Sequence, residues 1–324
     1  MASPLRALRD DLGYLGIRAL LGGSRVLPLA ALRALTRAAA RAALAFPGRD
    51  RGRARQHIAM AFPDRPEVWR RALLGACAGH LGAVLGEVAW LWSAAPAAIL
   101  GRTEFVGLEH LTGALTAERG ALLVTGHCGN WEWLNLGLGA SDVPITVAAR
   151  QVYDPRLDEV ARRLRGRFGG ETALRGKGAG AKLLHALRHG RVIGLLIDQD
   201  IEAPGAFVEF FGRPAWTPTG AALLAVRSQC PVVTGFAVRR GDGTMRLEFD
   251  PPVAPPAGED LDADVARLTA ALTARIERQV RAHPEQWVWM HKRWRHQPGN
   301  GESVWRDAPP APAPGASPAG GRLG

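Results

Sequence analysis

Short apolar runs alternate with stretches of helical periodicity through most of this sequence, and that alternation limits the fold more than any other feature. Apolar runs of this length, bounded by turn-forming residues, are typical of strands with buried faces. They occur at residues 121–124, 145–148, 192–197 and 232–238, and an alternating run at 245–249 predicts an edge strand. Helical patterns occupy residues 66–92, 154–165, 179–188, 219–227 and 262–281. The sequence therefore predicts one α/β domain.

The regions that flank this middle part differ from it in composition. Residues 1–60 contain eleven Arg against three Asp, among many Leu and Ala, and the chain from residue 298 onward is rich in Pro, Ala and Gly. A segment with few large apolar side chains cannot bury enough surface to fold. We therefore expect a basic, membrane-associated helical region at 1–60, an α/β domain at 61–297 and a disordered tail at 298–324.

Arginines interrupt the apolar N-terminal stretch, so that no run in it reaches the roughly 18 uncharged residues of a spanning helix. Arg33, Arg37 and Arg41 share one helix face. They are expected to snorkel from a helix lying in the headgroup layer of an anionic membrane. The alternative is an ordinary amphipathic helix that packs on the domain. Although the formal net charge is +11, the chain has no nucleic-acid-binding motif, and no nucleic-acid partner is expected.

The stretch from Val124 to Glu132 carries the clearest chemical signal. An apolar run ends at a glycine, His127 follows at once, and Glu132 comes five residues later. Open α/β sheets place their chemistry at the carboxyl ends of strands. A neutral imidazole there can take a proton from a hydroxyl, and a carboxylate on its other nitrogen would orient it. No serine lies in a nucleophile elbow nearby, so the hydroxyl is expected to belong to the substrate. A loop histidine that only packs is the alternative.

Basic residues stand at two further strand or helix ends. Arg150 ends the apolar run at 145–148, and Arg175-Gly176-Lys177-Gly178 leads into a predicted helix. Backbone N–H groups, the helix dipole and cations make such a loop suitable for a phosphate or carboxylate. It is not a Walker A loop, because the first glycine is missing. Solvated surface charge is the alternative for each of these residues.

Two more segments follow the strand predicted at 192–197. Asp198 and Asp200 close that strand and could hold a metal or hydrogen-bond a sugar, but two carboxylates alone are a weak metal signal, so polar structural or hydrogen-bond-acceptor contacts are favoured. The next segment, from Ala206 to Gly212, contains Phe210 and Phe211 and is apolar enough for an acyl chain, although a buried strand explains it equally well. Three cysteines lie far apart, which argues against structural zinc and against a disulfide framework. No metal and no cofactor are expected.

In chain order these segments are similar to the motifs of one enzyme family. The motifs are His127-x4-Glu132, Arg150 before a helix, Arg175-x-Lys177, Asp198-Gln199-Asp200, Phe210-Phe211-Gly212 and Pro284-Glu285-Gln286-Trp287-x-Trp289-x-His291-x-Arg293-Trp294. Over about residues 10–297 the chain resembles the late acyltransferases of lipid A biosynthesis, the lauroyl and myristoyl transferases of the lysophospholipid acyltransferase group. Members usually carry a clear N-terminal membrane helix, and the arginine-studded stretch here departs from that pattern.

The resemblance implies a mostly parallel sheet flanked by helices, attached to the cytoplasmic face of the inner membrane. It also implies that His127 takes the proton from a hydroxyl of a membrane-held glycolipid, that Glu132 orients the imidazole, and that the oxygen attacks an acyl thioester on acyl carrier protein. Arg150, Arg175 and Lys177 would hold acceptor phosphates or stabilise the oxyanion.

Three alternatives remain open. Cys128, beside the histidine, invites a covalent acyl-cysteine route. A related acyltransferase could act on another lipid, such as a phosphatidylinositol mannoside or an ornithine lipid, from acyl-CoA. A non-catalytic lipid-binding protein is the alternative from a different class.

Overall fold

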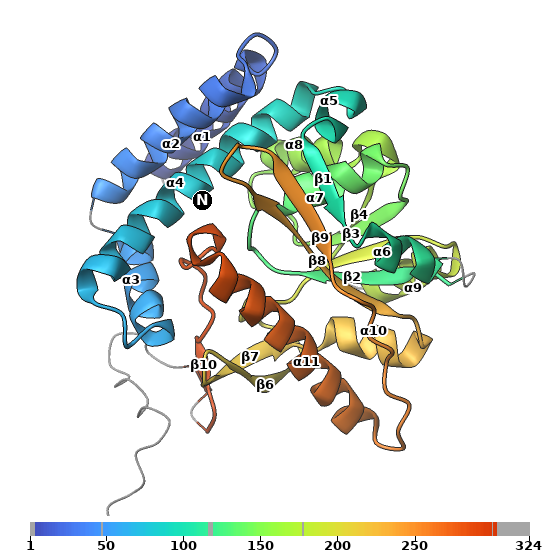
Figure 1. Ribbon diagram of the computed structural model, residues 1–324. Coiled ribbons are helices and arrows are strands. Elements are labelled where there is room, and N and C mark those ends of the chain that lie inside the picture. Colours follow the sequence, from blue (N-terminus) through green and yellow to red (C-terminus); the bar gives the residue numbers. More distant parts are fainter. Residues whose placement is uncertain (1–3, 47, 116–118, 177, 300, 303–324) are drawn as a thin grey trace, which may run out of the picture.

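A seven-stranded sheet forms the centre of the protein (Figure 1). The structure is a computed structural model and describes residues 4–46, 48–115, 119–176, 178–299 and 301–302. The strands lie in the order β1-β9-β8-β2-β5-β3-β4. Their bounds are β1 Thr103–Val106, β2 Ala121–Thr125, β3 Ile145–Ala149, β4 Glu171–Leu174, β5 Val192–Leu196, β8 Val232–Arg239 and β9 Met245–Phe249.

The sheet is mostly parallel, as expected. Of its pairings, β1 with β9, β8 with β2, β2 with β5, β5 with β3 and β3 with β4 are parallel, and β8 with β9 is antiparallel. Parallel strands are covered on both faces and therefore read as continuous apolar runs, which is why β2, β5 and β8 are evident in the sequence. In the register of β2 and β5, Thr125 lies opposite Leu196.

The strand predictions failed at the two ends of the sheet. Residues 245–249 do not form an edge strand, because β1 pairs with the outer side of β9. Neither β1 nor β4 was predicted, since the residues of both strands are mostly half-buried or exposed and form no apolar run. The true edges are thus the strands with the weakest hydrophobic signal.

Helices cover both faces of the sheet. One face packs against α9 Ala179–Arg188, α10 Gly220–Ser228, α11 Leu261–Ala282 and the hairpin of β6 Gly205–Phe210 with β7 Arg213–Pro218. The core on the other face includes residues of α5 Pro96–Leu100, α6 Leu108–Leu115, α7 Trp131–Ala140 and α8 Pro155–Arg165. The five predicted helices agree with α4 and α8–α11 to within one residue at each end. Short elements complete the chain: η1 Arg167–Gly169, η2 Pro284–Gln286, and β10 His296–Gln297 paired with β11 Gly301–Glu302.

Four helices precede the sheet: α1 Pro4–Gly23, α2 Leu29–Ala45, α3 Arg49–Ala61 and α4 Glu67–Ser93. Figure 1 shows α1 and α2, in blue, lying along α4. At the crossing of α2 and α4 the backbones touch, since a Cβ added to Gly82 would lie 2.4 Å from the Thr36 carbonyl oxygen. By length and composition α4 could cross a membrane, but 67% of its most apolar 18-residue window is buried in the protein.

Of the three arginines expected to snorkel from α2, Arg33 points into the protein instead, whereas Arg37 is half-buried and Arg41 is exposed. Arg33 is buried and ion-paired with Glu87 of α4, and the Arg41 guanidinium lies over Gly79. The inward-facing arginine is stable there because α4 supplies a buried carboxylate, which the spacing of arginines in α2 alone could not reveal. The predicted tail at 298–324 falls mostly outside the described residues.

Candidate active site

His127 and Asp198 meet at the carboxyl edge of the sheet. Each lies two residues beyond the paired positions Thr125 of β2 and Leu196 of β5, so the strand register brings them together. The His127 Nδ1 lies 2.7 Å from Asp198 Oδ1, and the His127 backbone N–H donates to Asp198 Oδ2 at 2.7 Å. The indole N–H of Trp287 donates to the same Oδ2 at 2.8 Å. Three hydrogen bonds thus fix the carboxylate and the imidazole that it holds.

The carboxylate of Asp198 stays ionised in this setting. Burial alone would raise its pKa, but the charge and hydrogen bond of His127, the nearby His291 and the Trp287 N–H together lower the pKa of Asp198 well below its usual range. With Asp198 on Nδ1, the other ring nitrogen of His127, Nε2, is the one left for a substrate. The His127 side chain is 17% exposed, so a substrate can reach it.

Two aromatic rings frame the imidazole of His127. The ring of Trp131 lies edge-on at 4.8 Å between centroids, and that of His291 at 4.4 Å. The Gln199 amide nitrogen lies 2.9 Å from His291 Nε2. Burial, followed by the neighbouring charge of His127, lowers the pKa of His291 to about 3, which keeps its ring neutral at physiological pH. A neutral His291 ring therefore does not compete with His127 for the negative charge of the Asp198 carboxylate.

His127, Asp198 and His291 together have the ligand types of a metal site. Ligand atoms of His127, Asp198 and His291 lie within 4.8 Å of one another. Both oxygens of Asp198, however, already accept hydrogen bonds from N–H groups of His127, and Oδ2 accepts another from Trp287. A metal would have to displace these donors, so the residues present fit a hydrogen-bonded pair better than a metal site.

Glu132 does not contact His127, contrary to the sequence-based expectation. It lies in the first turn of α7, where its carboxylate faces α8 and pairs with Arg165, with Nε–O distances of 3.0 and 3.1 Å. The helix direction explains the error, because α7 starts at Trp131 and turns Glu132 away from the loop that carries His127. Asp198 on the neighbouring strand takes the orienting position instead. The available signal was that His127 and Asp198 both follow apolar runs whose carboxyl ends meet in a parallel sheet.

Cys128 is directed into the core and is not poised for chemistry. Its side chain is buried, and burial, followed by the charge of Asp198, raises the pKa of the Cys128 thiol well above its usual value. The nucleophile in a covalent route is the thiolate, and a raised pKa removes it. The environment of Cys128 therefore does not favour the acyl-cysteine alternative.

The predicted basic residues converge at the carboxyl ends of the neighbouring strands. Arg150 follows β3, and Arg175 follows β4 and donates its backbone N–H to the Ala149 carbonyl at 2.9 Å. Partial burial, and then the charge of Arg150, lower the pKa of the Arg175 guanidinium, so the two cations are close enough to interact. Lys177 lies outside the described residues. An anionic group could neutralise this local excess of positive charge.

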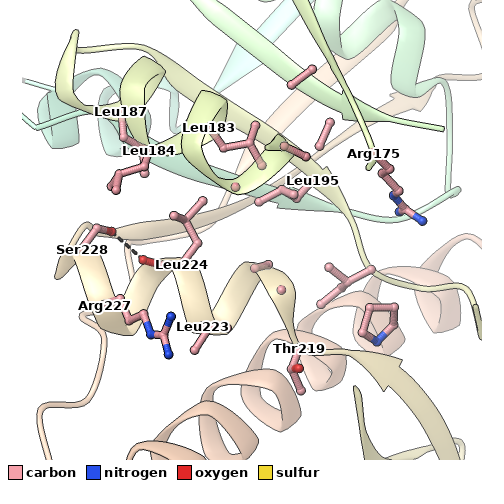
Figure 2. A pocket seen from close by; sticks show the side chains of 18 of the residues that line it. Arg175, Leu183, Leu184, Leu187, Leu195, Thr219, Leu223, Leu224, Arg227 and Ser228 are labelled. Atoms are coloured by element: carbon pink, nitrogen blue, oxygen red, sulfur yellow. Dashed lines mark hydrogen bonds between the residues drawn. The ribbon is translucent and has the colours of Figure 1, made fainter. Parts of the chain in front are cut away.

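A cavity of about 1020 Å³ lies between α9 and α10, against β5. Figure 2 shows Leu183, Leu184 and Leu187 of α9 facing Leu224 of α10, with Leu195 beside them; Leu223 of α10 also lines the cavity. Arg175 lines the cavity at the carboxyl edge of the sheet, and Arg227 at the opposite end of α10. The walls are therefore apolar along their length, with charged side chains toward both ends: Arg175 and Glu202 at the carboxyl edge and Arg227 at the other.

Phe210 and Phe211 do not line this cavity. They lie at the end of β6 and in the following turn, buried in an aromatic cluster with Trp287, Trp289 and Trp294. The strand β6 is buried on one face only, with Val208 and Phe210 inward and Phe207 and Glu209 exposed, so neither sequence-based interpretation describes the segment fully.

Asp200 serves a neighbouring segment of the protein. Its Oδ2 accepts the His296 backbone N–H at 2.7 Å, and its Oδ1 lies 2.5 Å from His296 Nδ1. Of the two predicted carboxylates, Asp198 therefore belongs to the candidate site, and Asp200 makes the polar structural contact that was favoured over a metal.

An apolar cavity beside a polar histidine–aspartate pair suits an enzyme that works on long apolar chains, and comparison with known proteins makes the class specific. Curated proteins with similar sequences are named as acyltransferases. Residues 2–296 match the model of the bacterial lipid A biosynthesis acyltransferases, and the chain belongs to that family.

Individual relatives differ in the acceptor that their names specify. A phosphatidylinositol mannoside acyltransferase of Mycobacterium tuberculosis is 30% identical over 58% of this chain and 58% of its own length. A lipid A biosynthesis lauroyltransferase of Escherichia coli is 28% identical over 79% of this chain and 82% of its own. Among solved structures, a 1-acyl-sn-glycerophosphate acyltransferase of Thermotoga maritima is similar at 17% identity and a TM-score of 0.36, over 70% of this chain and 86% of that one.

Proposed function

We propose that the protein transfers a fatty acyl chain from an acyl thioester to a hydroxyl of a lipid A precursor, with His127 as general base. The observation that carries this proposal is the 2.7 Å contact between His127 Nδ1 and the buried, ionised Asp198. A carboxylate in that position fixes the tautomer that leaves Nε2 able to accept a proton, and stabilises the imidazolium that then forms.

The proposed reaction needs no enzyme nucleophile. His127 Nε2 takes the proton of the acceptor hydroxyl as the oxygen attacks the thioester carbonyl carbon. The C–O bond forms, the C–S bond breaks when the tetrahedral intermediate collapses, and the imidazolium returns its proton to the leaving thiolate. The products are the ester and the free thiol, and the histidine is restored.

The cavity between α9 and α10 is the proposed site of the donor's acyl chain. Its volume of about 1020 Å³ stands at the upper end of the usual range for ligand pockets, about 300–1,000 Å³. The cavity is lined by Arg175 and Ile197 at the carboxyl edge of the sheet, and Ile197 immediately precedes Asp198. A chain lying in it with its thioester at that edge would present the carbonyl to the site.

The basic residues at the same edge are proposed to serve the acceptor or the oxyanion. Arg150 and Arg175 are close enough to influence one another, and Lys177 follows in the same loop. A phosphate on the acceptor, or the negative charge on the carbonyl oxygen during attack, would be stabilised by such cations. Acyl carrier protein, an acidic partner, is the proposed donor, and the net charge of +11 favours its approach.

We propose that α1 and the turn after it contact the cytoplasmic face of the inner membrane. Leu8, Leu12 and Leu15 follow helical spacing and are 56%, 61% and 59% exposed, and Val26 in the turn is 83% exposed. A contiguous apolar surface of this kind indicates an interaction site. Alkaline carbonate should release the protein from membranes, whereas resistance to carbonate would favour a spanning anchor.

One observation favours a second acceptor class. The relative with 30% identity is named for phosphatidylinositol mannoside, so a related glycolipid with acyl-CoA as donor is the alternative. The test is to offer purified enzyme a lauroyl thioester of acyl carrier protein or lauroyl-CoA, each with a lipid A precursor or a phosphatidylinositol mannoside, and to detect the acylated lipid by mass spectrometry. Transfer to the mannoside alone, or from lauroyl-CoA alone, would replace the proposed acceptor or donor.

The covalent route is tested by Cys128→Ala. Because the thiol is buried and protonated, this variant is expected to keep most of the wild-type turnover. A correctly folded Cys128→Ala enzyme without activity would contradict the direct mechanism and support an acyl-cysteine intermediate.

A further inference from the structure

A buried carboxylate on α4 joins the N-terminal helices to the loop that follows β2. Glu87 is fully buried, and its oxygens accept hydrogen bonds from Arg33 Nε at 2.7 Å, from Asn130 Nδ2 at 2.8 Å and from Arg239 Nη2 at 2.7 Å. Burial would raise the pKa of Glu87, but the hydrogen bonds and charges of Arg239, the charge of Arg33 and the Asn130 bond lower it. The carboxylate is therefore ionised and held by three separate elements, α2, β8 and the loop before α7.

Arg33 reaches Glu87 because α2 and α4 pack at backbone contact. A Cβ on Gly86 would lie 2.7 Å from Thr36 Oγ1 and 2.8 Å from the Leu32 carbonyl oxygen, closer than real atoms approach. Arg33 also donates to the Gly243 carbonyl at 2.7 Å, in the turn between β8 and β9. Its guanidinium is thus fixed at both ends and has little freedom to reorient.

Asn130, the partner of Glu87 in the loop, determines how α7 begins. Its side-chain oxygen accepts the backbone N–H groups of Glu132 and Trp133 at 3.1 and 3.0 Å, and its own N–H donates to the Ala237 carbonyl of β8 at 2.8 Å. Substitution of an N-cap asparagine perturbs the first turn of a helix. The amide of Asn130 therefore couples Glu87 to α7, which starts four residues after His127.

A second branch of the same network holds the neighbouring glycine. Arg239 Nη1 donates to His80 Nδ1 at 2.7 Å, so the Nε2–H of His80 donates to the Gly129 carbonyl at 3.1 Å. Burial and the charge of Arg239 lower the pKa of His80 to about 3, which is consistent with a neutral ring in that role. Gly129 and Asn130, which follow His127 and Cys128 directly, are thus both held by groups that contact Glu87 or Arg239.

We infer that Arg33 is a positioning residue for the loop 127–130, acting through Glu87 on Asn130, so that α2 is part of the catalytic assembly. The inference rests on the proposed role of His127. It goes beyond membrane contact, because the Arg33 side chain is buried and ion-paired with α4. Without Arg33, Glu87 keeps its hydrogen bond from Asn130 but loses the guanidinium that holds it from α2.

The test compares Arg33→Met with a matched control, Arg41→Met, two turns further along the same face of α2. Turnover is measured with a lauroyl thioester of acyl carrier protein and a lipid A precursor in detergent micelles. For Arg33→Met we expect kcat to fall about ten-fold, the effect of losing one charge-assisted contact, with the acceptor KM little changed. Arg41→Met should match the wild type in both. Equal losses in the two variants, or a change in KM alone, would overturn the inference.

A double-mutant cycle separates positioning from general destabilisation. Asn130→Ser can still cap α7 but cannot reach Glu87, so Arg33→Met should cost much less in that background than in the wild type. Additive losses would show that Arg33 does not act through Asn130. If Arg33→Met does not fold, Arg33→Lys takes its place in the cycle, because a lysine keeps the charge but cannot make both contacts of the guanidinium.

A measurement that does not depend on turnover distinguishes this inference from the proposed function. The imidazole NMR signal of His127, assigned by its loss in His127→Ala, should shift in Arg33→Met and stay in place in Arg41→Met. A shift together with a fully active His127→Ala enzyme would sink the proposed mechanism and leave the positioning network standing. An unmoved signal would overturn the positioning role whatever the activity.

Discussion

Two aspartates in the loop after β5 each pair with a histidine from another segment, and the two pairs have the same internal contacts. In each, one carboxylate oxygen accepts the backbone N–H of the histidine and the other contacts Nδ1: Asp198 with His127, and Asp200 with His296. The histidine side chains are 17% and 21% exposed. The contacts between histidine and aspartate, and the exposure of the histidines, therefore do not separate a catalytic pair from a structural one; the other partners of the carboxylates differ, with Trp287 on Asp198 and Arg295 near Asp200.

What separates them is the surroundings of each ring. His127 lies between Trp131 and His291 at the carboxyl edge of the central sheet. His296 belongs to the two-residue strand β10, with Trp216 at 6.0 Å, and its pairing with Asp200 ties the last described segment to the β5 loop. The first pair is proposed to transfer a proton, and the second to fix a chain end.

Removing the two histidines should give the largest contrast. We expect His127→Ala to lower turnover by on the order of 10²–10⁴-fold, the usual contribution of a general base. His296→Ala should remain within a few-fold of the wild type. Steady-state kinetics with the lipid A precursor measure both, with circular dichroism as the folding control. Equal losses of turnover in the two variants would contradict the distinction between a catalytic pair and a structural pair.

The two aspartates should differ by a smaller factor. Asp198→Asn removes the charge that stabilises the imidazolium, a loss of about 1.5–3 kcal/mol, or roughly ten- to hundred-fold in kcat. Asp200→Asn should change the melting temperature and leave kcat close to the wild-type value. If Glu132→Gln, which breaks the pair with Arg165, lowered kcat while Asp198→Asn did not, the original assignment of Glu132 would be restored.

Arg175 lines the same cavity as Ile197, which precedes Asp198, and it sharpens the comparison through substrate binding. If it holds an acceptor phosphate, Arg175→Met should raise the acceptor KM about ten-fold, with little effect on the donor KM. Lys182→Met, an exposed cation on α9, is the control and should change neither. A rise in the donor KM alone would assign Arg175 to the docking of acyl carrier protein.

The smallest expected effect is on stability. His296→Gln and His127→Gln each remove one hydrogen bond to a carboxylate, so both should lower the melting temperature by on the order of 2 °C. Thermal unfolding followed by circular dichroism measures this shift. The two pairs would then contribute equally to stability and differ only in activity. A much larger shift in melting temperature for one variant would contradict this.

The sequence was most informative where strands are buried on both faces. The runs that became β2, β5 and β8 were recognised because parallel strands in the middle of a sheet need apolar residues throughout. The half-exposed strand β1 and the polar strand β4 gave no such signal. Five helices, α4 and α8–α11, were predicted closely because their apolar periodicity extends over at least two turns, whereas the shorter helices α5 and α6, and α7, were not predicted.

The candidate site could be predicted only in part. His127 was identified from its place after a strand, but its partner was assigned to Glu132 by closeness along the chain. Contacts between neighbouring parallel strands depend on register, which a single sequence does not state. For the same reason nothing in the arginine spacing of α2 indicated that Arg33 would face a buried carboxylate on α4.

The register of β2 and β5 also sets when the protein can become active. His127 and Asp198 are 71 residues apart in the chain and meet only after the two strands have paired. Pairing of this kind must first overcome the entropy of closing a long loop, so it is slow compared with helix formation. During refolding, the helical signal can therefore return early, whereas acyl transfer will return no sooner than the centre of the sheet. The return of activity during refolding therefore reports when these two distant strands have paired.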